Sequence, residues 1–169
     1  MEHIVDFENL VEAHSRELYV YLWRLLGDET EAQDALQDTY LRAWKAYERL
    51  EADANTRAWL YKIAGNWART LLKKRARGDG YSRDFVAGLA DGRNGPGAQV
   101  AERERLIELH SAVMKLPDRQ REAILMRKYQ ELNYAEIAAV LGCSEDSARA
   151  NVYQGLKKLR KTLGEEVQA

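Results

Sequence analysis

Apolar residues recur at helical spacing along the N-terminal part of the chain. In the first 26 residues they follow the i, i+3, i+4, i+7 rhythm of an amphipathic helix, which Gly27 is suited to end. The stretch Thr30-Glu-Ala-Gln33 has the form of a capping box and predicts a second helix to about Leu50. A third helix is predicted over residues 56–77. The apolar face of the first helix comprises Phe7, Leu10, Val11, His14, Leu18, Tyr21, Leu22 and Leu25.

The C-terminal part is also periodic in the helical sense, and no segment has the alternation typical of a strand. Residues 99–116 predict one helix, and Pro117-Asp118 begins another that runs through Tyr129. Two shorter helices follow at 134–141 and 145–163.

Glycine separates these two parts. Residues 78–97 hold six of the eleven glycines and one of the two prolines, a composition that costs much entropy to order and buries little. We therefore predict an all-α protein of two small helical domains, residues 1–77 and 99–169, joined by a flexible linker at 78–98. The C-terminal domain contains the helix-turn-helix described below.

Composition narrows the classes of protein. A net charge of −1 argues against a protein that coats nucleic acid indiscriminately, although local basic patches act over a Debye length of about 10 Å. The single cysteine, Cys143, excludes an internal disulfide and a cysteine-rich zinc site. No apolar run approaches the roughly 20 residues of a membrane span, and MEHIVDFENL lacks a signal peptide. We expect a cytoplasmic protein with no membrane contact of its own and no cofactor.

Charge is segregated along the chain. Residues 1–50 hold eleven Asp and Glu against five Lys and Arg, whereas residues 56–77 hold seven basic residues and no acid. On a helix, one face of 56–77 carries a basic row of Lys62, Asn66, Arg69 and Lys73. Such a row beside aromatic residues suits DNA backbone and exposed bases, where stacking contributes about 1–3 kcal/mol per base. The alternative is an ordinary basic helix whose Trp59 and Trp67 belong to the core.

The predicted second helix has two different faces. The outward one, here called the acidic face, is typical of a surface that docks on another protein, because it combines acids with an apolar point. A solvated face with one stray leucine is the alternative. The inward residues are Ala32, Ala35, Leu36, Thr39, Tyr40, Ala43, Trp44 and Tyr47, and the acidic face comprises Asp34, Gln37, Asp38, Leu41, Arg42 and Lys45.

Residues 133–163, NYAEIAAVLGCSEDSARANVYQGLKKLRKTL, have the pattern of a helix-turn-helix. Asn133 and Ser144 are suited to cap its two helices, with Glu136 at the reciprocal capping-box position and Gly142 in the turn. The second helix of this motif enters the DNA major groove. Its early outward residues are Asp146, Ser147, Arg149, Ala150, Tyr153 and, at the edge, Asn151; Lys157, Lys158, Arg160 and Lys161 suit phosphates. A plain helical hairpin with a solvated basic end is the alternative.

Three stretches together resemble a known family. DALQDTYLRAW, then RAWLYKIAGNWARTLLKKRAR, then LPDRQREAIL with YAEIAAVLGCSEDSARANVYQGLKKLR resemble the two domains of bacterial sigma factors. The size, with only a linker between the domains, is similar to the extracytoplasmic-function (ECF) class. The resemblance covers both predicted domains in the right order and leaves out the linker and the EEVQA tail.

The resemblance implies partners and residue roles. The family's acidic-faced helix docks on the β′ clamp helices of core RNA polymerase, and the following loop and basic helix open the −10 promoter element. The helix-turn-helix reads the −35 element while resting on the β flap, and an anti-sigma factor usually holds the protein inactive. The implied polymerase contacts are Asp34, Gln37, Asp38, Leu41 and Arg42; the −10 contacts are Lys62, Asn66, Arg69 and Lys73, with Glu48–Asn55 as the loop that receives a flipped base; the −35 contacts are Ser147, Arg149, Ala150, Asn151, Tyr153 and Lys157.

Some positions depart from the family pattern, so the promoter sequence is not predicted. Gly65 and Asn151 stand where the family often has Arg, and Thr70 stands where it often has Asp. In the recognition helix, Ser147-Ala148 replaces a common Thr-Val.

Two other functions are alternatives for this sequence. A helix-turn-helix regulator that acts without polymerase would bind duplex DNA by itself, but it leaves the acidic face unexplained. A metal-dependent nuclease would use Asp34 and Asp38 as metal ligands. The three histidines of this chain are scattered along the sequence, however, and no third acidic ligand is evident beside these two. The sigma resemblance instead implies a protein that does no chemistry of its own, because polymerase supplies the active site.

Overall fold

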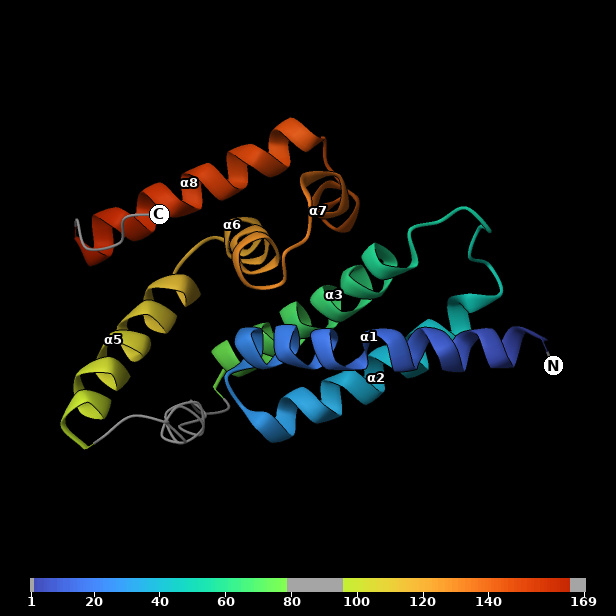
Figure 1. Cartoon of the computed structure of the whole chain (residues 1–169), viewed down its shortest axis with the longest axis horizontal. Coiled ribbons are helices and arrows are strands. Elements are labelled where there is room, and N and C mark those ends of the chain that lie inside the picture. Colours follow the sequence, from blue (N-terminus) through green and yellow to red (C-terminus); the bar gives the residue numbers. More distant parts are fainter. Residues whose placement is uncertain (1, 79–95, 165–169) are drawn as a thin grey trace.

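The computed structural model describes residues 2–78 and 96–164, and this part of the chain is helical without strands (Figure 1). The all-α prediction is confirmed. Residues 79–95, which make up most of the predicted linker, lie outside the described residues. Pro96 and Gly97, predicted to belong to the linker, instead open a helix, in keeping with the preference of proline for a first helical turn.

The N-terminal unit is a bundle of three helices, α1 (Glu2–Leu26), α2 (Glu29–Tyr47) and α3 (Thr56–Ala76), each of which packs on the other two. Gly27 ends α1 with φ of 73°, as predicted. The aromatic rings of Tyr21 and Tyr61 lie 5.0 Å apart between α1 and α3, and both residues are fully buried. The remaining core includes Leu18, Leu22, Leu25, Ala32, Ala35, Ala43, Leu60, Ala64 and Ala68.

Three details of α2 differ from prediction. Its N-cap is Asp28, not Thr30, because the Asp28 side chain accepts a hydrogen bond from the Glu31 backbone N–H at 2.8 Å directly after the α1 terminator. Trp44, predicted to point inward, is 45% exposed. Its ring packs edge-on against Phe7 of α1 at 5.1 Å, on the rim of the bundle. The helix also ends at Tyr47 rather than at Leu50.

The C-terminal unit comprises α5 (Pro96–Met114), α6 (Asp118–Ile124), a π-helical turn η1 (Leu125–Tyr129), α7 (Tyr134–Leu141) and α8 (Glu145–Leu163). The predicted capping box of Asn133 and Glu136 forms, and the Ser144 side chain caps α8 by accepting from the Ser147 N–H. Gly142 adopts the left-handed conformation, with φ of 64°, in the tight turn between α7 and α8. The single helix predicted from Asp118 to Tyr129 changes to π-helical geometry at Leu125.

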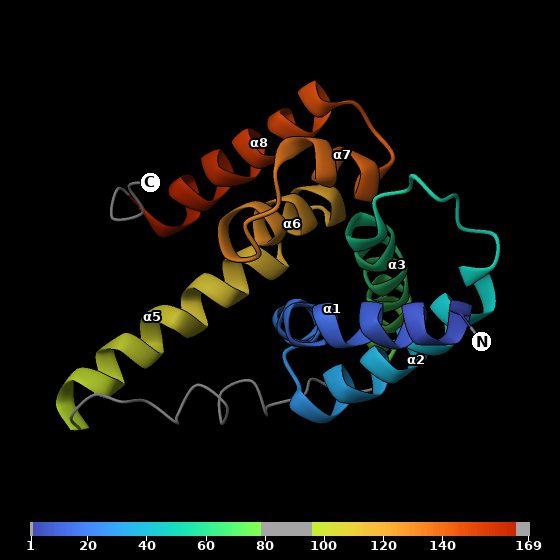
Figure 2. The same cartoon turned by 45° about the vertical axis from the view of Figure 1, so that its right-hand side comes forward.

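The two units are in contact, which the sequence analysis did not predict. Helix α3 packs against α7, and α1 touches η1 (Figures 1 and 2). In both views α2 lies on the far side of the N-terminal bundle from α6, α7 and α8. The α2 surface is therefore left open while one side of α3 faces the C-terminal unit.

Candidate nucleic-acid and protein interfaces

The acidic face of α2 is accessible. Asp34, Gln37, Leu41 and Arg42 are exposed and Asp38 is half-buried. Leu41, at 59% exposure, lines a shallow hollow with residues of both α1 and α2. The residues around this hollow are Phe7, Glu8, Gln37, Tyr40, Leu41 and Trp44. The apolar point predicted from the sequence is thus part of a larger apolar surface, of which Trp44 is the member that helical periodicity assigned to the core.

Arg42 links the acidic face to α3. Its guanidinium lies 4.0 Å from the centroid of the Trp67 indole ring, a cation–π contact. Trp67 packs half-buried against the hydrophobic core. The acidic face of α2 is therefore joined to α3 through a residue that packs on the core.

The basic row of α3 is placed on one face but is unevenly accessible. Lys62, Asn66 and Lys73 are exposed, whereas Arg69 is half-buried. The Arg69 Nη2 donates to both carboxylate oxygens of Glu122 in α6, at 2.9 and 2.7 Å, and its Nη1 donates to Asn66 Oδ1 at 3.4 Å. Burial alone would lower the pKa of Arg69, but its pairing with Glu122 raises it. The Arg69 side chain therefore stays positively charged, and it is already paired with the Glu122 carboxylate.

Other basic residues of α3 hold the protein together. Arg57 is bidentate to Glu17 of α1, with its closest contact at 2.8 Å, and it also pairs with Glu136 of α7 at 3.2 Å. Arg75 pairs with Glu31 and donates to the Leu26 carbonyl. Part of the positive charge of residues 56–77 therefore stabilises the fold and is not available to a ligand. The remaining exposed cations of this helix and its C-terminal end are Lys62, Lys73, Lys74 and Arg77.

The loop between α2 and α3 is mostly exposed. Asn55 at its end caps α3 by accepting from the Ala58 N–H at 3.0 Å, which fixes the first turn of the basic helix. Glu51 and Asp53 point to solvent with no role in the core. This loop, Glu48–Asn55, lies beside the N-terminal end of the basic row.

The recognition helix α8 presents an accessible surface. Ser147, Arg149, Ala150, Tyr153 and Lys157 are exposed, and Tyr153 reaches 62% exposure. Asn151 is half-buried, and its side-chain amide donates to the Ser147 carbonyl at 3.0 Å.

Arg149 is held near the turn. It pairs with Asp146 at 3.5 Å, and its guanidinium lies 4.9 Å from the Tyr134 ring centroid. The sequence analysis did not assign a role to Tyr134, whose ring also lies under Arg127 at 4.5 Å.

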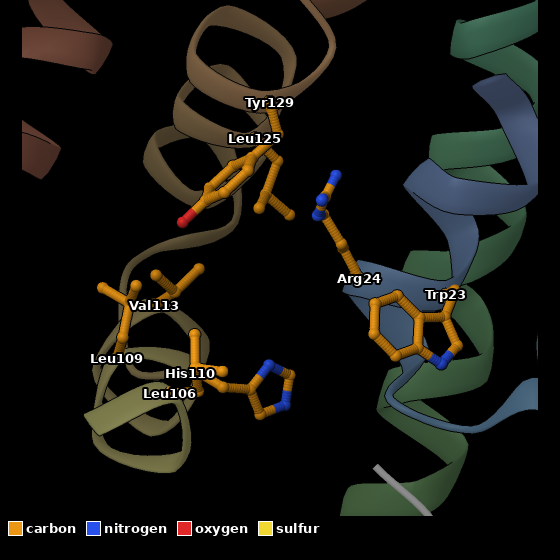
Figure 3. Close-up of a pocket in the computed structure, with 8 residues that line it drawn as sticks. All are labelled: Trp23, Arg24, Leu106, Leu109, His110, Val113, Leu125 and Tyr129. Carbon is orange, nitrogen blue, oxygen red and sulfur yellow. The ribbon is translucent and has the colours of Figure 1, made fainter. Parts of the chain in front are cut away.

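A pocket lies between α1, α5 and η1 (Figure 3). Arg24 stacks on the Tyr129 ring at 4.4 Å on one side, while His110 projects from α5 on the other. Burial, with a smaller contribution from Arg75, lowers the pKa of His110 to about 4, so the imidazole is neutral at neutral pH. The lining residues are Trp23, Arg24, Leu106, Leu109, His110, Val113, Leu125 and Tyr129.

The described residues contain neither a cluster of metal ligands nor a membrane-spanning helix. Over residues 2–78 and 96–164, no group of three or more His, Cys, Asp or Glu is arranged to hold a metal ion. Nor does any helix there combine the length and apolar character needed to cross a membrane.

Comparison with known proteins supports a two-region organisation. Residues 10–78 match the family model "Sigma-70 region 2", and residues 106–159 match "Sigma-70, region 4". The chain is 31% identical to the RNA polymerase sigma factor CarQ of Myxococcus xanthus, over 94% of this chain and 90% of CarQ. It is 28% identical to the ECF RNA polymerase sigma factor SigW of Bacillus subtilis, over 93% of this chain and 88% of SigW.

Two solved structures share the fold. The sigma factor RpoE, solved with the anti-sigma factor NepR from Bartonella quintana, superposes with a TM-score of 0.73 at 24% identity, covering 96% of this chain and 99% of RpoE. CnrH, solved with the cytosolic domain of CnrY, gives a TM-score of 0.69 at 27% identity, covering 95% of this chain and 88% of CnrH.

Proposed function

Because the chain belongs to the ECF class of RNA polymerase sigma factors, which direct promoter-specific initiation, we propose that its accessible faces divide that work. The acidic face of α2 binds the β′ clamp helices of core polymerase through Asp34, Gln37, Asp38, Leu41 and Arg42. The basic row of α3 binds the −10 element and its opened strand. Helix α8 reads the −35 element while the C-terminal unit rests on the β flap.

The observation that carries this division is the separation of charge between two helices that pack together. The acidic face is open on one side of the bundle, and the exposed members of the basic row, Lys62, Asn66 and Lys73, lie on another helix. Phosphates are attracted to the second surface, whereas the first carries two acids, Asp34 and Asp38, beside the bases Arg42 and Lys45. A protein partner and a nucleic acid can therefore bind the same small unit at the same time.

The helix-turn-helix supplies the second DNA contact. Ser147, Arg149, Ala150, Tyr153 and Lys157 are accessible on α8, and Asn151 lies at their edge. Early residues of a recognition helix reach base edges, while Lys157, farther along, suits a phosphate.

The remaining assignments follow from this function. Domain two occupies residues 1–77, the linker residues 78–95, and domain four the residues from Pro96, where α5 begins, to 169. The protein acts in the cytoplasm, where core polymerase and promoter DNA are, and does no chemistry of its own. Because the relatives RpoE and CnrH were solved with NepR and with the cytosolic domain of CnrY, an anti-sigma factor is the further partner we propose.

Co-elution of the purified chain with bacterial core RNA polymerase tests the docking face. Wild type should co-elute stoichiometrically, and Asp34→Lys with Asp38→Lys should not, because the variant reverses the charge of both acids of the face. Glu104→Lys with Glu108→Lys is the matched control: it has the same i, i+4 spacing and charge change on exposed positions of α5. Loss of binding in the control as well, or retention in both variants, would rule out the α2 face as the docking surface.

A further inference from the structure

One contact between the two units is made by Arg69, a residue of the basic row that we propose to bind the −10 element. Arg69 donates two hydrogen bonds to Glu122, and the Arg69 Nε lies 3.9 Å from the Asp118 carboxylate. The Glu122 side chain is only 3% exposed. A charge-assisted pair of this kind engages the Nη2 group of the guanidinium, which would otherwise be able to donate to a phosphate.

Helix α3 is shaped to accept Glu122. A Cβ atom added at Gly65 would lie 2.9 Å from the Glu122 Oε1, closer than side-chain carbons normally approach an oxygen. Gly65 is buried in the middle of α3. A glycine inside a helix costs about 1 kcal/mol of helix stability relative to alanine. The absent side chain lets the carboxylate of α6 lie directly against the backbone of α3.

A second set of polar contacts lies at the opposite end of the same interface. The Gln130 Nε2 donates to the Tyr61 hydroxyl at 2.9 Å and to the Glu17 carbonyl at 2.8 Å. Arg57 bonds Glu17 within its own unit and bridges to Glu136 and to the Gln130 carbonyl of the other unit. Gln130 and Tyr61 are buried, so these bonds form in a site of low dielectric.

We propose that the free protein rests in a closed state in which Glu122 of α6 holds Arg69 of α3, so that the C-terminal unit withholds Arg69 from promoter DNA while Lys62, Asn66 and Lys73 stay exposed. Gly65, Arg69 and Glu122 together form the latch. The acidic face of α2 lies outside this contact, so the closed protein can still meet polymerase (Figures 1 and 2).

Closure is incompatible with reading a promoter. The −35 and −10 elements are about 25 base pairs apart, which is about 85 Å of B-form DNA at about 3.4 Å per pair. In the closed state α3 and α7 are in contact, so the two units cannot engage both elements. This consequence rests on the proposed function, whereas the closed state itself does not.

The latch is tested by the distance between the units in the full chain. Spin labels are placed on cysteines introduced at Gln33 of α2 and Gln154 of α8, both exposed, in a Cys143→Ser background. The labelled chain that keeps Gly65, Arg69 and Glu122 should give one narrow distribution of distances between the two labels. Glu122→Lys places an ammonium beside Arg69, and it should raise the ratio of open to closed protein by at least about tenfold. Glu104→Lys, with the same charge change at an exposed position of α5, should leave the distribution unchanged.

Exchanging the charges of Arg69 and Glu122 distinguishes loss of the ion pair from misfolding caused by Glu122→Lys. Arg69→Glu combined with Glu122→Arg reverses the pair and should restore the narrow distribution, which a lesion of the C-terminal core would not. A broad distribution for the wild-type chain, or a narrow one that Glu122→Lys leaves unchanged, would overturn the closed state. A distribution as broad for the charge exchange as for Glu122→Lys alone would overturn the role of the Arg69–Glu122 pair.

The functional consequence has its own measurement. Binding of a fluorescent, random-sequence 20-nucleotide single strand to the isolated chain should be tighter for Glu122→Lys than for Glu104→Lys by at least about fivefold, since the two carry equal net charge. If the two variants bind the strand equally while Glu122→Lys broadens the distance distribution, the closed state holds but its effect on DNA binding is refuted. Failure of the α2 face in co-elution would refute the docking proposal without affecting either result.

Discussion

Replacing Leu41 by alanine tests whether the apolar point on the acidic face is buried by core RNA polymerase. The substitution removes three carbon atoms, each contributing about 0.8 kcal/mol when transferred out of water. Since 59% of the surface of Leu41 is accessible before docking, about 1.4 kcal/mol of binding free energy is at stake. The expected result is therefore about a tenfold rise in Kd for core polymerase.

The same substitution should leave the free protein intact. Leu41 contributes little to the core, so the free energy of unfolding should change by no more than about 0.5 kcal/mol. Fluorescence titration of labelled protein with core polymerase measures Kd, and denaturant titration measures stability.

Val100→Ala is the control, because Val100 is 58% exposed on α5 and lies outside both regions matched to the sigma-70 family models. An unchanged Kd for Leu41→Ala, or an equal rise for Val100→Ala, would refute burial of this face by polymerase.

Two further predictions concern DNA and pH. Arg69→Ala with Lys73→Ala should weaken open-complex formation in permanganate footprinting and reduce the salt dependence of strand binding by about 1.4 in log–log slope, with polymerase binding unchanged. Lost polymerase binding would show that the faces are misassigned. His110 has a pKa of about 4 in the folded state against about 6.5 unfolded, so the unfolded state binds more protons between these values. Acidification from pH 7.5 to 5 should therefore cost about 1–2 kcal/mol of stability that His110→Gln does not lose; an identical pH dependence in the variant would contradict burial of a neutral imidazole.

Local features of the fold could be predicted from the sequence because neighbouring residues determine them. Asn133, Glu136, Gly142 and Ser144 lie within a few positions of the groups they cap or turn, and the structure agrees at each. The start of α2 was wrong because two acceptable caps stand two residues apart, and Asp28 follows the α1 terminator directly.

The surroundings of a helix are harder to predict than its faces. Periodicity assigned Trp44 to the core, but it cannot tell where the bundle ends, and this ring lies on the rim against Phe7. The basic helix was predicted to gather charge for DNA, yet Arg57 and Arg75 pair within the protein.

The contacts between units were beyond sequence reasoning. Arg69 and Glu122 are 53 positions apart, and Arg57 and Glu136 are 79 apart. Nothing local marks either acid as a partner: Glu122 looks like one more charged residue of an amphipathic helix. Only the folded structure shows that the glycine at 65 on α3 and the acid at 122 on α6 meet.

The most direct test of the account is transcription by bacterial core polymerase on a library of genomic fragments from the same organism, with and without the chain, followed by mapping of transcript 5′ ends. The account predicts new start sites that share two sequence elements, near −10 and −35, and that disappear with Asp34→Lys plus Asp38→Lys. Start sites that are absent, or that arise equally without the chain, would contradict it.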